Sequence, residues 1–362
     1  MKKVLFMATM GLLVATVSCQ NNAGYTIKGK IIGGSDGDTV YLQRLDKGLV
    51  PVDTTVLKGE SFTFSGTPDS VPSGYYITAQ IGGRPAMVGL YLENGTIDVT
   101  VSAGSANVSG TPSNDAFQKF QEGMIDIMQQ KQELIKQLQL DTTRMAEIGG
   151  KIAHQDSLMV EHIRNTVRGN IGNACGIGLL ASGSDLFEFS ELESLVAQVP
   201  AMYASAPEVK ALQTKIQLEG PTAVGKKFTD FTMNTPEGKS VKLSDFVSQN
   251  EYTLVDFWAS WCGPCRAEMP NVVKAYEQFK AKGFGVVGVS LDSDAEAWKK
   301  GISDLNITWA QMSDLKGWDC EGAKLYGVRS IPSTVLINKE GVIVARNLSA
   351  EALHNKLSEL LK

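Results

Sequence analysis

Two cysteines separated by two residues are the part of this sequence best suited to chemistry. Cys262 and Cys265 follow an apolar strand, Leu254 to Ala259, and precede a run in which apolar residues recur at helical spacing. Gly263 and Pro264 lie between them, and proline suits the first turn of a helix because its missing N–H would have no partner there. The pair is therefore expected at the amino end of a helix that follows a central strand.

This position predicts different tasks for the two cysteines. The free N–H groups and the dipole at a helix amino terminus stabilise a thiolate, which is the nucleophile in thiol–disulfide exchange. Cys262 is therefore expected to attack a substrate disulfide. Cys265, one turn into the helix, is expected to be more shielded and to form the internal disulfide that releases the substrate. A Cys-x-x-Cys pair alone is also compatible with metal binding, but none of the 3 histidines is near it in sequence, so no zinc site is expected.

The segment Val255 to Cys265 closely resembles the thioredoxin superfamily. A second segment, Gly327 to Thr334, matches the loop of that superfamily in which a cis proline faces the disulfide. The resemblance implies that the Ile331–Pro332 bond is cis and that the backbone of Ile331 pairs with an extended substrate. The residues expected by this match to contact the substrate are Trp261, Gly263, Pro264, Ile331 and Pro332.

Two further features resemble the TlpA-like, membrane-tethered reductases of the bacterial envelope, which are associated with cytochrome maturation. Glu268 follows the pair as Cys-Arg-Ala-Glu-Met-Pro, and the stretch before Pro332 is long enough for an extra helix–strand unit at about residues 295–312. In that branch the acid at the position of Glu268 tunes the cysteines. Asp256 matches the buried acid of thioredoxins, which takes a proton from the second cysteine. The strand Phe284 to Leu291 departs from thioredoxins, because it lacks the lysine that usually partners this acid.

Residues 1–19 have the pattern of a lipoprotein-type signal peptide. Two lysines precede an apolar run, Val4 to Val17, that is too short to span a bilayer. Cys19 after a serine resembles the site at which such a cysteine is acylated, although Thr16 stands where these sites usually have leucine. Plain secretion with cleavage nearby is the alternative. The expected location is the cell envelope or periplasm, with a lipid on Cys19 as the membrane anchor.

Three regions follow the signal peptide. Residues 25–110 have the pattern of short strands separated by turns, which predicts a small β-sandwich. Residues 113–220 carry apolar residues at helical spacing and are expected to form a helical segment. Residues 222–362 alternate strands and helices, and are expected to form an α/β thioredoxin fold. The first two regions resemble the accessory part of Bacteroidetes-type envelope thioredoxins.

The composition limits the possible partners. With 362 residues, 43% of them hydrophobic and 20% charged, the chain is typical of a globular protein of two or three domains. A formal net charge of −5 gives no reason to expect nucleic-acid binding. No cofactor is expected, and the partners are protein thiols and disulfides, an unidentified electron donor, and a membrane reached through the lipid.

Cys175 is expected to be a small buried hydrophobe, and Cys320 either an unreactive thiol or a third redox thiol.

The leading interpretation is a thiol–disulfide oxidoreductase that acts on protein disulfides as a reductant, because Gly-Pro between the cysteines resembles reducing thioredoxins. A peroxiredoxin is the alternative enzyme, since its inserted α/β layout is shared, but the Pro-x-x-x-Thr-x-x-Cys pattern is absent. A third hypothesis is a binding or scaffolding lipoprotein in which residues 25–220 carry the main activity. Disulfide turnover by the C-terminal part would distinguish these hypotheses.

Overall fold

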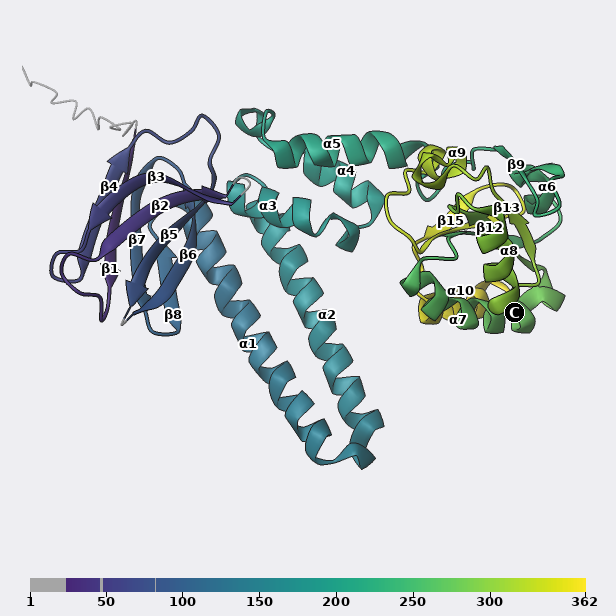
Figure 1. Cartoon of the computed structure of the whole chain (residues 1–362), viewed down its shortest axis with the longest axis horizontal. Helices are drawn as coiled ribbons and strands as arrows, with labels where there is room; N and C mark the ends of the chain where they lie inside the picture. Colours follow the sequence, from purple (N-terminus) through teal and green to yellow (C-terminus); the bar gives the residue numbers. More distant parts are fainter. Residues whose placement is uncertain (1–23, 46–47, 82) are drawn as a thin grey trace, which may run out of the picture. The chain divides into compact units, whose positions relative to one another are not determined.

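The computed structural model describes residues 24–45, 48–81 and 83–362 (Figure 1). The expected signal peptide with Cys19 lies outside these residues. Contacts divide the chain into two units between Gly178 and Leu179, within helix α3 (Ala174–Ser182). This division precedes residue 222, because helices α4 (Phe189–Ala197) and α5 (Pro207–Glu219) fall in the second unit. That the chain divides into separately folding domains at residues 25–110, 113–220 and 222–362 therefore stays a prediction.

The first unit begins with the predicted β-sandwich, made of two four-stranded sheets with the orders β4-β1-β7-β8 and β3-β2-β5-β6. The strands are β1 (Tyr25–Ile31), β2 (Thr39–Leu45), β3 (Leu49–Val56), β4 (Ser61–Gly66), β5 (Ser73–Ile81), β6 (Arg84–Leu92), β7 (Gly95–Ser102) and β8 (Ser105–Ser109). Side chains alternate along β1, where Ile27 and Ile31 are buried and Lys28 and Lys30 are exposed. This alternation gives the sandwich an apolar core between its sheets.

Two long helices follow the sandwich, as the helical spacing predicts. Helix α1 (Pro112–Leu140) packs along α2 (Met145–Asn170), and a short 3-10 turn joins them. The beginning of α1 is tied to the sandwich, because the Asn114 side-chain amide donates to the carbonyl oxygen of Tyr91 at 2.8 Å. The Ser113 hydroxyl donates to the Glu93 carboxylate, also at 2.8 Å. The long helices thus start from a fixed point on the sandwich.

The second unit contains a five-stranded sheet with the order β13-β12-β11-β14-β15. Strands β11, β12 and β13 are parallel, whereas β14 and β15 are antiparallel to their neighbours. The elements of this unit after α5 are β9 (Thr232–Asn234), β10 (Ser240–Lys242), α6 (Leu243–Val247), β11 (Tyr252–Trp258), α7 (Gly263–Phe279), β12 (Phe284–Ser290), α8 (Ala295–Asp304), β13 (Ala310–Met312), α9 (Glu321–Leu325), β14 (Ser333–Asn338), β15 (Ile343–Arg346) and α10 (Ala350–Leu360). This arrangement is the predicted thioredoxin fold, and α8 with β13 forms the predicted extra helix–strand unit.

The central strand β11 places its side chains alternately on the two faces of the sheet. Asp256 lies on the face that α7 and α10 cover, and these two helices pack against each other (Figure 1). Phe257 lies on the opposite face, where its ring centroid is 5.7 Å from that of Tyr326, directly after α9. Nearly all of β11 is buried, because helices cover both faces. The strand therefore carries Asp256 into the interior, beneath the cysteine-bearing end of α7.

Candidate active site

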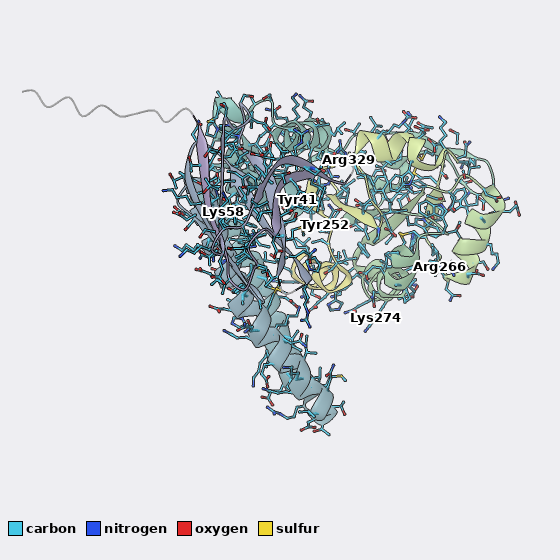
Figure 2. The ribbon with its side chains drawn as sticks, turned by 60° about the vertical axis from the view of Figure 1, so that its left-hand side comes forward. Tyr41, Lys58, Tyr252, Arg266, Lys274 and Arg329 are labelled. Carbon is cyan, nitrogen blue, oxygen red and sulfur yellow. A yellow bond between two sulfur atoms is a disulfide. The ribbon has the colours of Figure 1, made fainter. Side chains whose placement is uncertain are left out.

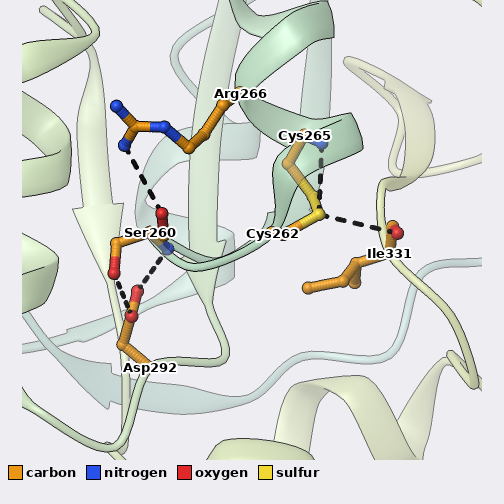
Figure 3. The surroundings of a disulfide bond; sticks show 6 residues. All are labelled: Ser260, Cys262, Cys265, Arg266, Asp292 and Ile331. Carbon is orange, nitrogen blue, oxygen red and sulfur yellow. Dashed lines mark hydrogen bonds between the residues drawn. A yellow bond between two sulfur atoms is a disulfide. The ribbon is translucent and has the colours of Figure 1, made fainter.

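The two cysteines of the motif form a disulfide at the amino end of α7. Their Cα atoms are 5.3 Å apart, and the dihedral angles of Cys262 are those of an N-cap residue rather than of a helix. The Sγ of Cys262 accepts the backbone N–H of Cys265 at 3.1 Å (Figure 3). This hydrogen bond and the dipole of α7 both favour negative charge on Cys262 once the disulfide is reduced.

A second loop approaches the disulfide from the segment between α9 and β14. The carbonyl oxygen of Ile331 lies 3.7 Å from the Sγ of Cys262 (Figure 3), and the Ile331–Pro332 bond is cis, which confirms that expectation. Pro332 is exposed, and so is Arg329, which lies earlier in the loop (Figure 2). A backbone carbonyl group therefore lies beside the Cys262 sulfur.

The turn that leads into the motif is held by a buried carboxylate. Asp292 is 1% exposed and accepts the Ser260 N–H at 3.0 Å and the Ser260 hydroxyl at 2.6 Å (Figure 3). The hydroxyl of Ser290 donates to the same carboxylate at 2.8 Å. On the other side, Gly301 of α8 leaves no room for a Cβ, which would come within 2.8 Å of the Ser260 Cβ. The extra helix and Asp292 together fix the turn from which Cys262 projects.

Asp256, Cys265 and Glu268 line one cavity of about 340 Å³ between α7 and α10. Asp256 is 3% exposed and Cys265 is 2% exposed, whereas Glu268 is partly exposed. Pro332 lines the same cavity. The structure thus brings both predicted acids to the cavity that the second cysteine lines.

Burial controls the charge of the acid on the central strand. Removal from water, and secondly the nearby carboxylate of Glu268, raise the pKa of Asp256 from 3.8 to about 7. Both causes disfavour the ionised form, since a carboxylate is poorly solvated there and two negative charges repel. Asp256 can therefore hold or release a proton near neutral pH, as general acid–base chemistry requires.

The substrate-contact residues expected from the resemblance lie around Cys262 and differ in exposure. Trp261 is 56% exposed, and Gly263 and Pro264 are exposed beside it. Ile331 is partly buried. These positions form an accessible rim around a disulfide whose own residues are almost fully buried.

The remaining described cysteines take no part in the disulfide. Cys175 and Cys320 are both fully buried and carry free thiols. Burial raises the pKa of Cys175 to about 12 and that of Cys320 to about 11. Both thiols therefore stay protonated at neutral pH and are poor nucleophiles. This agrees with the small buried hydrophobe expected at Cys175, and for Cys320 it favours the unreactive alternative over a third redox thiol.

Sequence reasoning missed several residues that shape the site. Asp292 lies 30 residues after the first cysteine, and no local motif links it to Ser260. The cavity is also lined by residues from α7, β14, α10 and the loop before α10, namely Met269, Val272, Thr334, Asn347, Leu348, Ser349 and Leu353. Only the strand alternation of β14, which places Thr334 opposite Asp256, could have indicated one of them.

Two family models match the chain. The model described as AhpC/TSA family matches residues 224–346, which contain the disulfide and the cis-proline loop. The model described as a domain of unknown function, DUF4369, matches residues 25–117, the sandwich and the beginning of α1. Neither of these two models covers residues 118–223, which contain most of the helical segment.

Curated relatives and solved structures cover the same C-terminal part. Thiol-disulfide oxidoreductase ResA of Bacillus thuringiensis subsp. konkukian is 30% identical over 139 residues, which are 38% of this chain and 77% of the relative. The solved thioredoxin domain of a thiol-disulfide oxidoreductase from Bacteroides vulgatus is 36% identical and has a TM-score of 0.36, covering 39% of this chain and 99% of that one. A thiol-disulfide oxidoreductase from Bacteroides fragilis is 35% identical with a TM-score of 0.36, covering 38% and 100%. With its cysteine pair at the amino end of α7 and this identity over most of the ResA sequence, the chain belongs to the thioredoxin-like thiol–disulfide oxidoreductases.

Proposed function

We propose that this protein reduces disulfides of other proteins in the cell envelope, with Cys262 and Cys265 as a two-electron carrier. The observation that carries the proposal is the position of the Cys262 sulfur, which accepts the Cys265 N–H and lies 3.7 Å from the Ile331 carbonyl oxygen. One sulfur is thus held where a thiolate is stabilised and beside a backbone edge with which a substrate chain can pair.

In the first step, the thiolate of Cys262 attacks one sulfur of the substrate disulfide. A bond forms between Cys262 and that sulfur, and the substrate disulfide breaks. The other substrate sulfur leaves as a thiolate and takes up a proton from water. The N–H of Cys265 stabilises the attacking thiolate before this step.

In the second step, Cys265 loses its proton and attacks the Sγ of Cys262. The Cys262–Cys265 disulfide forms, the mixed disulfide breaks, and the second substrate sulfur leaves as a thiolate. The substrate has then gained two electrons and the protein has lost two. We assign the proton of Cys265 to Asp256, because both line one cavity and the pKa of about 7 lets this carboxyl exchange a proton near neutral pH.

The direction of transfer rests on the residues between the cysteines. Gly263 and Pro264 resemble the corresponding pair of reducing thioredoxins, whose potential is about −270 mV. Such a potential favours giving electrons to disulfides of higher potential, which are the strained or exposed ones, and not to structural disulfides, which typically lie below about −300 mV. A donor outside this chain must then return two electrons to the Cys262–Cys265 disulfide.

The proposal is tested with the reduced full chain and a protein that carries one accessible disulfide, such as insulin. We expect loss of the substrate disulfide with the appearance of the Cys262–Cys265 disulfide, and no reaction after prior alkylation of the chain. Consumption of hydrogen peroxide with protein disulfides left intact would instead favour the peroxiredoxin alternative. A chain that does neither would favour the scaffolding alternative.

The proposed site of action is the cell envelope, where disulfides persist and their reduction needs a dedicated protein. The support is the lipoprotein-like pattern of residues 1–19. Across the described ranges 24–45, 48–81 and 83–362, no helix combines the length and the apolar character needed to cross a bilayer. A lipid on Cys19 is the proposed means of attachment.

Substitution of the expected lipid-bearing residue tests this location. Cys19→Ala should leave an unlipidated precursor that is not processed at this position, because acylation needs the cysteine sulfur. The measurement is incorporation of a labelled fatty acid into full-length protein in a bacterial host, with Cys175→Ala as the matched control. The control should label like the wild type. Labelling that survives Cys19→Ala would disprove the anchor.

A further inference from the structure

An indole from the segment between β13 and α9 lies beside the active-site motif. Trp318 sits on the 3-10 turn η6 (Gly317–Asp319), between β13 and α9, and its ring centroid is 6.3 Å from that of Trp261. This distance lies within the range of favourable aromatic pairs, and the two rings are inclined at 56°. Since Trp261 directly precedes Cys262, the pair brings a residue remote in sequence to the edge of the disulfide. We call Trp261 and Trp318 the tryptophan pair.

The turn η6 is fixed at both ends. The Asp314 carboxylate accepts the N–H of Lys316 at 3.2 Å and the N–H of Glu321 at 3.0 Å. Gly317 has a φ of 58°, a left-handed conformation that glycine adopts without strain. Directly after the turn, Cys320 is 0% exposed and anchors the chain in the core. The indole is therefore held outward by an ordered turn.

The tryptophan pair belongs to a concentration of exposed apolar surface at the active site. Among the described side chains between residues 225 and 362, the exposed large apolar ones are Trp261, Leu315 and Trp318. Trp261 is 56% exposed and Trp318 is 49% exposed, although the two ring centroids are only 6.3 Å apart. Single exposed apolar residues need no explanation, but a cluster beside a reactive group marks a binding surface.

We propose that the tryptophan pair binds an apolar or aromatic side chain located close to the cysteine of a disulfide-bonded polypeptide. This proposal deepens the proposed function and rests on it, because it names the class of substrate that the same site selects. The occupant is a polypeptide, since the Ile331 carbonyl group beside the Cys262 sulfur suits pairing with an extended backbone.

The geometry places the contact within a few residues of the attacked cysteine. An extended chain advances about 3.3 Å per residue, so neighbours of the substrate cysteine pass over the residues that flank Cys262. Trp261 is the flanking residue on one side, and Trp318 widens the aromatic surface there. Trp318 is thus a specificity-determining residue that a short Cys-x-x-Cys motif does not contain.

The test compares two synthetic peptides that each carry one disulfide, equal in charge and length. One has phenylalanine two residues from its cysteine, and the other has glycine there. We expect the reduced full chain to react faster with the phenylalanine peptide, and Trp318→Ala to lower this preference about 3- to 10-fold, the contribution of one aromatic contact. Trp318→Phe should keep most of the preference. The readout is the ratio of the two second-order rate constants, which does not depend on the fraction of active protein.

Met202→Ala is the matched control, because Met202 is 55% exposed in the same unit but lies on a different 3-10 turn, between α4 and α5. The control should keep the wild-type ratio. Equal rates of the wild type with both peptides, or a ratio unchanged in Trp318→Ala, would overturn the inference while leaving disulfide reduction intact. Failure of the wild type to reduce either peptide would overturn the proposed function itself.

Discussion

Replacing Cys262 with serine should reduce the turnover of a protein disulfide to the uncatalysed rate, whereas Cys265→Ser should stop turnover but still allow the first attack. The structure gives the physical reason. Cys262 is the N-cap of α7 and its sulfur accepts an N–H, so its thiolate is the stabilised one. Without Cys265, the mixed disulfide has no internal thiol to resolve it and should accumulate.

The measurement is a non-reducing gel of each variant after a single exposure to a disulfide-bonded protein. Cys265→Ser should show a stoichiometric adduct, and Cys262→Ser should show none. Cys320→Ser and Cys175→Ser are matched controls, because burial keeps both thiols protonated at neutral pH. Each should turn over substrate like the wild type. Equal trapping by the two active-site variants would show that the roles of Cys262 and Cys265 are wrongly assigned.

Local sequence patterns were sufficient for the central features of the site. The apolar strand before Cys262 and the amphipathic run after Cys265 predicted that the pair lies at a helix terminus. Such a prediction is possible because the start of a helix is indicated by nearby residues, through N-cap residues, proline in the first turn and apolar periodicity. The family resemblance, and not local physics, gave the cis bond at Pro332. The sandwich was also predictable, since its strands alternate and its turns carry glycine.

Contacts between distant segments that the family resemblance does not cover could not be predicted. The carboxylate of Asp292 bonds to Ser260 only because β11 and β12 end side by side, which is a property of the sheet. Trp318 lies near Trp261 only because the segment between β13 and α9 comes close to the residue before Cys262. Neither pairing leaves a periodic signal in the sequence, since each depends on one side chain and on the path of a loop.

Substitution of Asp256 and Glu268 should slow the resolution of the mixed disulfide and affect the first attack by Cys262 much less. Both carboxyls line the cavity that contains Cys265, and both are placed to accept its proton or to oppose its charge. A general base typically contributes about 10²- to 10⁴-fold to a rate, but two acids that share the task can replace each other. Asp256→Asn with Glu268→Gln should therefore cost more than the product of the two single factors.

Stability separates this catalytic role from a structural one. The folded carboxyl of Asp256 keeps its proton up to about pH 7, whereas the unfolded one loses it near 3.8. Between pH 3.8 and about pH 7, Asp256 therefore takes up a proton when the protein folds. The free energy of unfolding of the wild type should then fall as the pH rises through this range. Asparagine does not ionise, so the free energy of unfolding of Asp256→Asn, relative to that of the wild type, should increase between pH 4 and pH 8. The increase should be on the order of 4 kcal/mol at most. Denaturant unfolding at both pH values measures this gain.

The kinetic measurement is the single-turnover rate of resolution against pH for the wild type, the two single variants and the double variant. The wild-type rate should rise with pH through about 7, as Asp256 ionises and becomes able to accept the proton of Cys265, and this rise should be absent in Asp256→Asn. Glu277→Gln is the matched control, because Glu277 lies exposed on the same helix and pairs with Lys280. Strictly multiplicative effects, or a double variant that resolves at the wild-type rate, would assign both carboxyls to structure. A slower double variant that also gains stability above pH 7 would show that this buried acid is retained for proton transfer at the expense of stability.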